Sequence, residues 1–456
     1  MCPIWPLHLI ILYIVAICPM WVLCQAAPKY LAKFLSETVE IHMGDYYYVN
    51  VSVTGSDLQI GDKMDLVSDN EHIATAKWNS TYFLTEEDFN KGRFDGRFRV
   101  DGHFLGRTEL MLEANRGTAH YLANGSLPIT VTRPQRVIDT IFTTSVAVFV
   151  SLIFINFGCA MHWPTVKGVL KRPIGPAIGM CGQFIFMPLV SFALGFLIFP
   201  NSPAMRLGMF FTGVSPGGGA SNIWTFILGG NLNLSLAMTT ISTLASFAFM
   251  PAWLFSLGQI VFANASIVVP YVRIATFVAG LIIPLMIGLA MQKLTPRVAA
   301  FMVRILKGFS TSLLLFIIIF AIVTNLYIFE LFSWEIIVAG MCIPWLGYAV
   351  GYVGARLLRQ SHEDALAISV EIGIQNTGIA IFLLRYALPQ PEADLTTVVP
   401  VSVAIMTPVP MTIIYIVQKI MSCVRNRNDH KKILEDDLKP VSEAPEPGVI
   451  STIDVK

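Results

Sequence analysis

The chain has 456 residues, of which 54% are hydrophobic and only 13% are charged, and its mean hydropathy is +0.64. This composition excludes an ordinary soluble globular protein and indicates a membrane protein. The formal net charge of +1 provides no electrostatic basis for binding nucleic acid, so no nucleic-acid partner is expected.

Residues 1–27 are typical of a secretory signal peptide. An apolar run from Leu7 to Leu23 is followed by the small residues Ala26 and Ala27. No lysine or arginine precedes the apolar run, so an uncleaved membrane anchor is the alternative interpretation. In either case, the sequence that follows is expected to be delivered outside the cytoplasm.

Residues 28–134 are predicted to form a small extracellular all-β sandwich. Apolar and polar residues alternate over 39–43, 47–53 and 127–131, as in strands that bury one face. Glycine-containing turn signals separate these stretches, and the segment contains no cysteine that could form an internal disulfide.

Nine apolar spans follow, and each is long enough for a tilted transmembrane helix. Their predicted bounds are 138–160, 174–199, 205–228, 233–260, 269–292, 308–329, 334–357, 363–386 and 395–421. Lysine and arginine concentrate in the loops that this order places in the cytoplasm, which agrees with the positive-inside rule. Residues 422–456 are charged and contain prolines, so they are predicted to form a disordered cytoplasmic tail.

Four N-glycosylation sequons fall on segments that this topology places on the extracellular or lumenal side. Their asparagines are Asn50, Asn79, Asn124 and Asn264.

Two polar, glycine-rich stretches interrupt the third and eighth spans: 216–222 (PGGGASN) and 371–378 (EIGIQNTG). A hydrocarbon core excludes unwound backbone and carboxylates unless they coordinate something. The eighth span follows the third by five spans, an odd number, so any repeat that relates the two stretches to each other is inverted in the membrane. Such inverted repeats are typical of a transport site at the bilayer midplane. The pair therefore predicts an ion-binding centre in an ion-coupled transporter.

The chemistry of these stretches favours Na⁺ as the ion and as the only metal. Glu371 supplies the only negative charge between Ala365 and Leu384, and hydroxyl and amide side chains accompany it. Such a hard-oxygen set suits Na⁺ better than a soft transition metal, and no histidine or cysteine accompanies it to indicate zinc. A buried carboxylate can also exchange a proton, so proton coupling is the alternative. No cofactor is expected.

Three further polar residues lie in neighbouring spans. Ser235 and Thr239 are four residues apart and therefore share a helix face, although their hydroxyls could simply bond the carbonyl one turn back. Gln183 is a lone amide in the second span, where an interhelical hydrogen bond is the alternative to ion binding.

Residues 213–222 and 371–378 resemble the signature stretches of the bile acid:sodium symporter family (solute carrier family ten), and residues 183–188 (QFIFMP) look like a third family segment. The resemblance covers roughly residues 138–421. Members that have a signal peptide and a long extracellular N-terminal domain look most similar.

The resemblance implies a core domain with two broken, crossing helices and a separate panel domain. Spans two to four and seven to nine would form the core, and spans one, five and six the panel. It also implies two sodium sites. The first would use Ser221, Asn222, Ser235, Thr239 and Glu371. The second would use Gln183, Glu371, Gln375 and the backbone carbonyls of Ile372 and Ile374.

The function implied is a symporter that moves a small organic anion inward with Na⁺: a bile salt, a steroid sulfate or another carboxylate. Candidate residues of the substrate crevice are Asn376, Thr377, Gly217 and Gly218. The alternative, from a different functional class, is a non-transporting receptor-like or adhesion-like protein in which the β domain binds a partner. An enzyme is not expected, because no nucleophile–base pair or metal-ligand spacing is present in the sequence.

Overall fold

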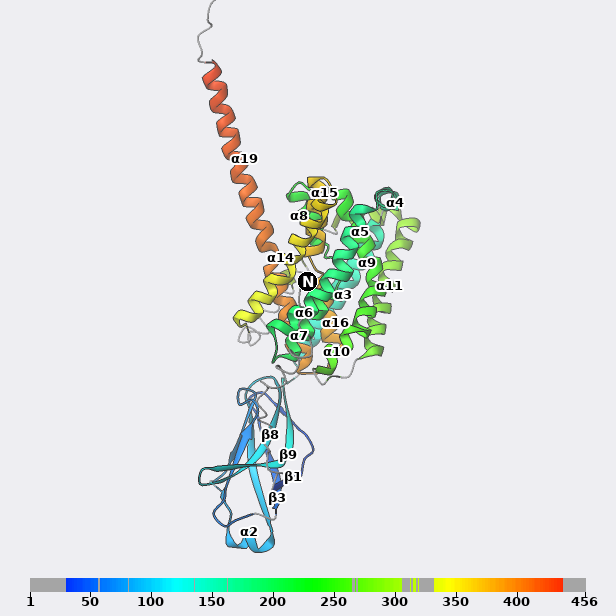
Figure 1. The fold of residues 1–456 in the computed structure, drawn as a ribbon. Coiled ribbons are helices and arrows are strands. Elements are labelled where there is room, and N and C mark those ends of the chain that lie inside the picture. Colours follow the sequence, from blue (N-terminus) through cyan, green and yellow to red (C-terminus); the bar gives the residue numbers. More distant parts are fainter. Residues whose placement is uncertain are drawn as a thin grey trace, which may run out of the picture. The chain divides into compact units, whose positions relative to one another are not determined.

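The computed structural model describes residues 30–305 and 332–437, with small gaps, and a few isolated positions between them. The gaps are 56, 57, 81, 135, 162, 265, 266, 268 and 269, and the isolated positions are 312, 315, 316 and 319. The predicted signal peptide, nearly all of the sixth predicted span and the end of the predicted tail lie outside the described residues. The described residues divide into two compact units: those within 1–142 together with 387–395, and those within 143–386 together with 396–456 (Figure 1).

Two β-sheets make up most of the first unit. One sheet contains, in order, β5 (Ala74–Trp78), β7 (Arg93–Gly102), β3 (Tyr46–Gly55) and β1 (Tyr30–Phe34). The other contains β6 (Tyr82–Phe83), β4 (Lys63–Ser68), β8 (Gly106–Arg116), β9 (Ala119–Thr132) and β2 (Val39–His42). Strands β1 and β2 pair with β9 in parallel, and the other pairs are antiparallel. The β1–β9 pair joins the two sheets into one continuous hydrogen-bonded sheet of nine strands.

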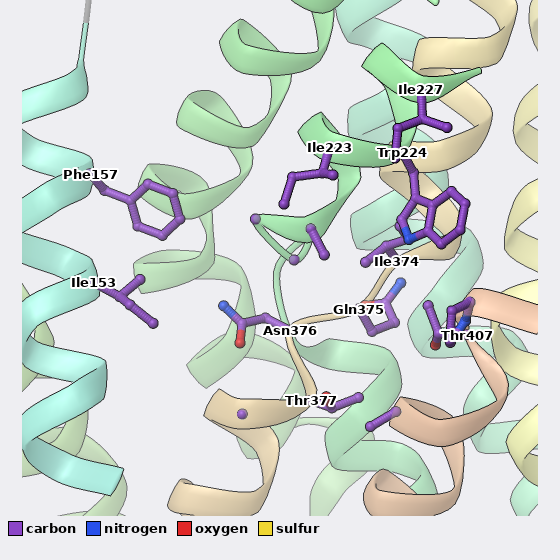
Figure 2. A pocket seen from close by; sticks show the side chains of 16 residues that line it. Ile153, Phe157, Ile223, Trp224, Ile227, Ile374, Gln375, Asn376, Thr377 and Thr407 are labelled. Atoms are coloured by element: carbon purple, nitrogen blue, oxygen red, sulfur yellow. The ribbon is translucent and has the colours of Figure 1, made fainter. Parts of the chain in front are cut away.

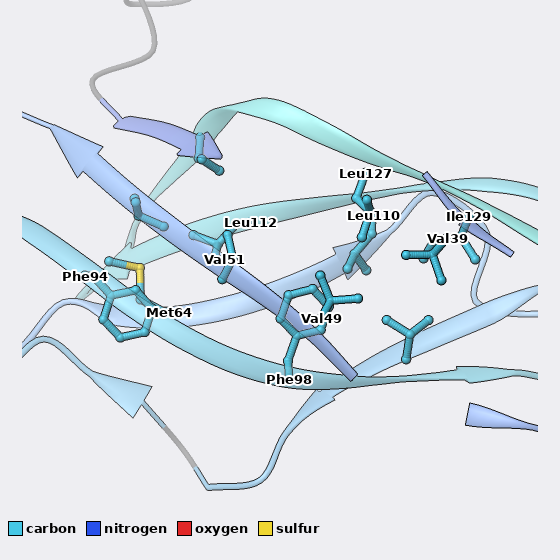
Figure 3. Packing of buried hydrophobic residues seen from close by; sticks show 14 of the residues in the cluster. Val39, Val49, Val51, Met64, Phe94, Phe98, Leu110, Leu112, Leu127 and Ile129 are labelled. Atoms are coloured by element: carbon cyan, nitrogen blue, oxygen red, sulfur yellow. The ribbon is translucent and has the colours of Figure 1, made fainter. Parts of the chain in front are cut away.

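The inward faces of both sheets share one hydrophobic core (Figure 3). In β3, Val49, Val51 and Val53 are buried while their neighbours face outward, as the alternation over 47–53 predicts. Phe98 of β7 and Leu112 of β8 pack in the same core from the two sheets. The alternation therefore predicts the buried positions 49, 51 and 53 of β3, whereas Tyr47, at the start of the same stretch, is exposed.

The prediction of an all-β domain misses one short helix, α2 (Glu86–Lys91). Its first turn is closed by a capping box, in which Thr85 Oγ1 accepts the Asp88 backbone N–H and the Asp88 carboxylate accepts the Thr85 N–H. Gly92 ends the helix in the left-handed conformation (φ 60°). The three consecutive acidic residues 86–88 favour the start of a helix, because negative charge is stabilised at a helix N-terminus.

A buried ion pair joins distant parts of the β unit. Asp62 is 1% exposed and accepts two hydrogen bonds from the Arg116 guanidinium, at 2.7 and 2.8 Å. Burial alone would raise the pKa of the Asp62 carboxyl, but the bonds from Arg116 and from the Gln59 backbone N–H lower it below its usual value. Burial and the Asp62 carboxylate together raise the pKa of the adjacent Tyr30 to about 12.

Replacing Asp62 with asparagine is expected to destabilise the β unit by about 3 kcal/mol, because it leaves the Arg116 charge without its partner. Pulse proteolysis of the full chain, followed on fragments of the β unit, measures this loss. The control is Glu87→Gln, which removes a surface ion pair with Lys91 and is expected to change stability by less than about 1 kcal/mol. Equal protease resistance of the two variants would contradict the role given to Asp62.

The same pair predicts a direction for acid sensitivity. Because the pKa of Asp62 is lower in the folded unit than in the unfolded chain, the pair stabilises the fold above about pH 4. That contribution is lost as the pH falls through the folded-state value.

The segment 387–395, between two helices of the apolar region, groups with the β unit. Arg107 Nε lies 2.7 Å from Glu392 Oε1, and Arg133 Nη2 lies 3.2 Å from Asp394 Oδ2. Both carboxylates are buried. These acids lie between the eighth and ninth predicted spans, in a loop that the predicted topology places outside the cytoplasm.

The second unit is helical, with α3 beginning just before it. The elements of this part of the chain are α3 (Val137–Ala160), α4 (Trp163–Leu170), α5 (Ile174–Cys181), the π-helical turn η1 (Gly182–Phe186), α6 (Met187–Ile198), α7 (Pro203–Val214), α8 (Ala220–Ile227), α9 (Leu232–Phe255), α10 (Leu257–Asn264), α11 (Tyr271–Leu294), α14 (Trp334–Leu357), α15 (His362–Gly373), α16 (Thr377–Ala387), α17 (Glu392–Leu395, within 387–395), α18 (Val398–Met406) and α19 (Pro408–Asp437).

Six helical runs among the described residues are long and apolar enough to cross a membrane. They are 137–160, 174–198, 232–255, 271–294, 334–357 and 392–424. The third and eighth predicted spans are not in this group, because each is split into two shorter helices at its glycine-rich stretch. The protein is therefore a helical membrane protein with an N-terminal β-rich domain.

The last helix differs from the prediction. Helix α19 continues to Asp437, whereas the last span was predicted to end at 421 and a disordered tail to begin at 422. The residues after 421 are charged but include many good helix formers, so low hydropathy marks the end of the apolar span and not the end of the helix.

Candidate functional site

The two glycine-rich stretches lie side by side and are hydrogen-bonded to each other. Gly217 and Gln375 form an antiparallel β-bridge. The Gly218 N–H donates to the Ile374 carbonyl at 2.7 Å, and the Asn376 N–H donates to the Pro216 carbonyl at 2.9 Å. These bonds satisfy the backbone groups that unwinding exposes, which apolar surroundings require.

Local sequence explains both breaks. Ser215 precedes Pro216 and is extended (ψ 152°), because a residue before proline avoids the helical conformation, and α7 therefore ends at Val214. A Cβ on Gly217 would lie 2.6 Å from Glu371 Oε1, and one on Gly218 would lie 3.0 Å from the Gln375 carbonyl oxygen. Only glycine allows the two stretches to approach this closely.

Glu371, in the last turn of α15, is the charged residue at this crossing. Its side chain is 2% exposed. Glu371 Oε2 accepts hydrogen bonds from Ser221 Oγ at 2.7 Å and from Thr239 Oγ1 at 2.8 Å. Within the part of the chain that the structure describes, no lysine, arginine or histidine forms an ion pair with it. Its described hydrogen-bond donors are all neutral, so a bound cation would compensate the negative charge of this carboxylate.

The residues of the first predicted sodium set cluster around this carboxylate from α8, α9 and α15. Ser235 Oγ donates to Asn222 Oδ1 at 2.9 Å, and Asn222 Nδ2 donates to Thr239 Oγ1 at 3.3 Å. Thr239 Oγ1 also lies 3.0 Å from the Ser235 carbonyl oxygen one turn back. The hydrogen bond within the helix that the sequence analysis gave as the alternative is therefore present, but it is only one of the contacts of this hydroxyl. Thr225, which sequence reasoning missed, donates to Ser235 Oγ at 3.3 Å.

The side chains of the second predicted set meet beside the same crossing. Gln183 Nε2 lies 2.7 Å from both the Ser215 carbonyl oxygen and Gln375 Oε1. Gln375 Nε2 donates to the Ile372 carbonyl at 2.8 Å, whereas the Ile374 carbonyl accepts the Gly218 N–H. Gln183 lies in the π-helical turn η1, and such turns often occur at functional sites.

Ser242 is a polar neighbour of Glu371 that sequence reasoning missed. Its Oγ lies 3.5 Å from Glu371 Oε1, and the residue is buried. The signal was present in the sequence, because Ser235, Thr239 and Ser242 follow a spacing of four and three residues along one helix face.

A cavity of about 340 Å³ lies next to the crossing (Figure 2). Three of the four predicted crevice residues line it, namely Gly218, Asn376 and Thr377, whereas Gly217 lies against Glu371. Apolar side chains that sequence reasoning missed form much of its wall, among them Ile153, Phe157, Ile223, Trp224 and Ile227. These come from α3 and α8, which no polar motif in the sequence marks as cavity walls.

Comparison with known proteins gives a consistent family relationship. Residues 147–330 match the model of the "Sodium Bile acid symporter family". The human P3 protein is 30% identical over 257 residues, which is 56% of this chain and 54% of that protein. The chain thus spans about half the length of this relative.

Two further relatives carry transporter names. The sodium-dependent organic anion transporter of Bos taurus is 31% identical over 54% of this chain and 65% of its own length. The ileal sodium/bile acid cotransporter of Oryctolagus cuniculus is 30% identical over 58% of this chain and 74% of its own length. Among solved structures, domains 4 and 5 of the S-layer protein SbsC match 22% of this chain and 50% of that one, at 17% identity and a TM-score of 0.17, which is too low to indicate a shared fold.

The family match, the identity to these relatives and the paired glycine-rich stretches of a helical membrane protein agree with one another. The chain belongs to the sodium/bile acid symporter family, a family of membrane transporters and not of enzymes.

Proposed function

We propose that the protein is a sodium-coupled symporter that carries an organic anion inward. One observation supports this most directly: the buried Glu371 carboxylate, held by neutral hydroxyls where two unwound stretches cross. A buried charge without an ionic partner is costly, and an alkali cation bound among hydroxyl, amide and carbonyl oxygens would offset that cost.

The proposed first sodium site consists of Ser221, Asn222, Ser235, Thr239 and Glu371, and the second of Gln183, Glu371, Gln375 and the carbonyls of Ile372 and Ile374. The side-chain oxygens of the first site come from three helices, α8, α9 and α15. A cation bound to all of them would hold these helices in one arrangement. Sodium binding would therefore change which conformation of the transporter is most stable, and this is the basis of coupling.

The cavity next to the crossing is the proposed substrate site. Helices α8 and α16 begin at Ala220 and Thr377, and both residues line the cavity. Helix N-termini carry partial positive charge and favour an anionic group, while Trp224 and Phe157 offer apolar surface to the body of the ligand. This combination suits an amphipathic organic anion such as a bile salt, a steroid sulfate or another carboxylate, and the names of the two transporter relatives agree with that class.

The proposed arrangement in the membrane is nine spans with the β-sandwich outside and the C-terminus in the cytoplasm. The lysine and arginine distribution supports this orientation. The two pairs of half-helices, α7 with α8 and α15 with α16, would supply the third and eighth spans of two inverted repeats, with the core moving against the panel to alternate access.

A screen in membrane vesicles tests the proposed function. Vesicles that contain the protein are given an inward gradient of NaCl or of choline chloride, and uptake of labelled bile salts, steroid sulfates and small carboxylates is measured. Uptake driven only by the sodium gradient is expected for one of these anion classes. If uptake instead follows a proton gradient regardless of sodium, the transporter is coupled to protons and not to sodium. If no anion is taken up, the result favours the receptor-like alternative.

Trp224→Ala is expected to weaken substrate binding, because it removes a large apolar surface from the cavity wall. The KM for the transported anion should rise about tenfold, while the sodium concentration for half-maximal uptake changes little. Phe226→Ala is the control, since Phe226 lies on the same helix, is 65% exposed and is not among the residues that line the cavity. If Trp224→Ala leaves the KM unchanged, the substrate does not bind against Trp224 in this cavity, and the proposed substrate site is wrong.

A further inference from the structure

A second, smaller cavity is lined by Glu371 but by no other residue of the first sodium set. Its volume is about 10 Å³, which is close to the minimum for one water molecule or one ion. Three of its lining side chains are polar, Gln183, Ser242 and Glu371, and they come from three different helical elements. Apolar residues form the remainder of the lining.

The two carboxylate oxygens of Glu371 differ in the number and length of their hydrogen bonds. Oε2 accepts two short hydrogen bonds, from Ser221 and Thr239. Among the residues that the structure describes, Oε1 has a single polar side-chain contact, the 3.5 Å separation from Ser242 Oγ. A buried carboxylate oxygen ordinarily has stronger partners than this, so Oε1 retains lone pairs for a further ligand.

The Ser242 hydroxyl has only one proton, and its best acceptor is not Glu371. Ser242 Oγ lies 3.1 Å from the Thr239 carbonyl oxygen, which is the shorter of its two contacts. If the proton is donated to the Thr239 carbonyl, no proton lies between Ser242 Oγ and Glu371 Oε1, which are 3.5 Å apart. Both oxygen atoms then have lone pairs free to bind a cation.

This separation matches two neighbouring ligands of one cation. Oxygen ligands of Ca²⁺, an ion close to Na⁺ in radius, lie at about 2.3–2.6 Å, so two ligands at right angles are roughly 3.3–3.7 Å apart. Gln183 adds a third oxygen. Its amide nitrogen donates to the Ser215 carbonyl and to Gln375 Oε1. Within the described part of the chain, Gln183 Oε1 has one long hydrogen-bond contact, 3.5 Å from Gln375 Nε2.

We infer that Ser242 is a ligand of the second coupled Na⁺, which it binds through its hydroxyl oxygen together with Glu371 Oε1 and Gln183 Oε1. Glu371 then serves the two ions through different oxygens, Oε2 for the first and Oε1 for the second. The inference rests on the proposed sodium coupling and adds a residue to it, because Ser242 belongs to neither predicted sodium set.

The test is sodium-dependent thermal stabilisation of the purified full-length protein in detergent. The melting temperature is measured against NaCl at constant ionic strength, with choline chloride as the balancing salt. Ser242→Ala is expected to raise the half-saturating sodium concentration about tenfold, since one oxygen ligand is lost. Ser242→Thr keeps the hydroxyl and is expected to restore a value near that of the unmodified protein.

Ser246→Ala is the matched control. Ser246 lies one turn further along α9, is also buried and donates to the Thr243 carbonyl at 2.7 Å, but it does not line the small cavity. Its sodium response should equal that of the unmodified protein.

The two ways of failing are distinguishable. If the unmodified protein is stabilised by sodium and Ser242→Ala responds like Ser246→Ala, the role of Ser242 is overturned while sodium coupling stands. If the unmodified protein gains no more stability from NaCl than from choline chloride, sodium coupling itself is overturned, and the inference with it.

Discussion

Glu371→Gln is expected to abolish sodium-dependent uptake while the protein still reaches the membrane. Glutamine keeps the size of the side chain and one oxygen, but it removes the negative charge that would balance the bound cations. Loss of a buried, charge-assisted contact typically costs about 3 kcal/mol, so uptake at limiting sodium should fall by at least about a hundredfold. The measurement is initial uptake rate against sodium concentration, normalised to the amount of protein at the cell surface.

Glu363→Gln is the control for this variant. Glu363 lies in the first turn of the same helix, α15, and is exposed, so its neutralisation should leave uptake unchanged. Sodium-dependent uptake at the normal level in Glu371→Gln would exclude this carboxylate as the coupling residue. Uptake that no longer depends on sodium but persists would instead show that the residue couples transport without being needed for substrate passage.

Gly217→Ala is expected to have an effect nearly as large. The added Cβ would lie 2.6 Å from Glu371 Oε1 and 3.3 Å from its Cδ, and a separation under 3 Å cannot be kept. The carboxylate must therefore leave its position between Ser221 and Thr239. Because ion sites tolerate little misplacement of their ligands, sodium affinity should fall at least about tenfold.

Gly280→Ala provides the comparison, since nothing lies within 4 Å of a Cβ built at Gly280 in α11. Both variants should be assayed for surface amount, for uptake and for sodium-dependent stabilisation. If Gly217→Ala retained normal sodium affinity in both assays, the close approach of the crossing stretch to the carboxylate would have no functional importance.

The crossing of the two glycine-rich stretches could be predicted from the sequence, because a carboxylate and unwound backbone carry a high free-energy cost in an apolar environment. Glu371 and the glycines at 217–219 are conspicuous among apolar residues, and their chemistry requires them to meet. Ser221, Thr239 and Gln183 were implicated by resemblance to a family, and the structure places all three within the same hydrogen-bonded cluster as Glu371 or Gln375. Strands β2, β3 and β9 of the β-rich domain were predictable in part for a simpler reason, the alternation of apolar and polar residues over 39–43, 47–53 and 127–131.

The remainder depends on packing that a single sequence does not display. Ser242 looks like any serine of an apolar helix until the position of Glu371 Oε1 is known. Phe157 and Trp224 are ordinary apolar residues whose shared cavity depends on how α3 and α8 are arranged. Asp62 and Arg116 are 54 positions apart in the chain, and no local pattern pairs them.

The backbone bonds between the crossing stretches have a mechanical consequence. Separating the two would remove the partners of the Gly218 and Asn376 N–H groups and of the Ile374 and Pro216 carbonyls, and a buried backbone group without a partner is costly. In the proposed transport cycle, the crossing would therefore move as one rigid piece. In that cycle, sliding would occur at the boundaries of this piece, and the cavity wall formed by Ile153 and Phe157 of α3 is one such boundary.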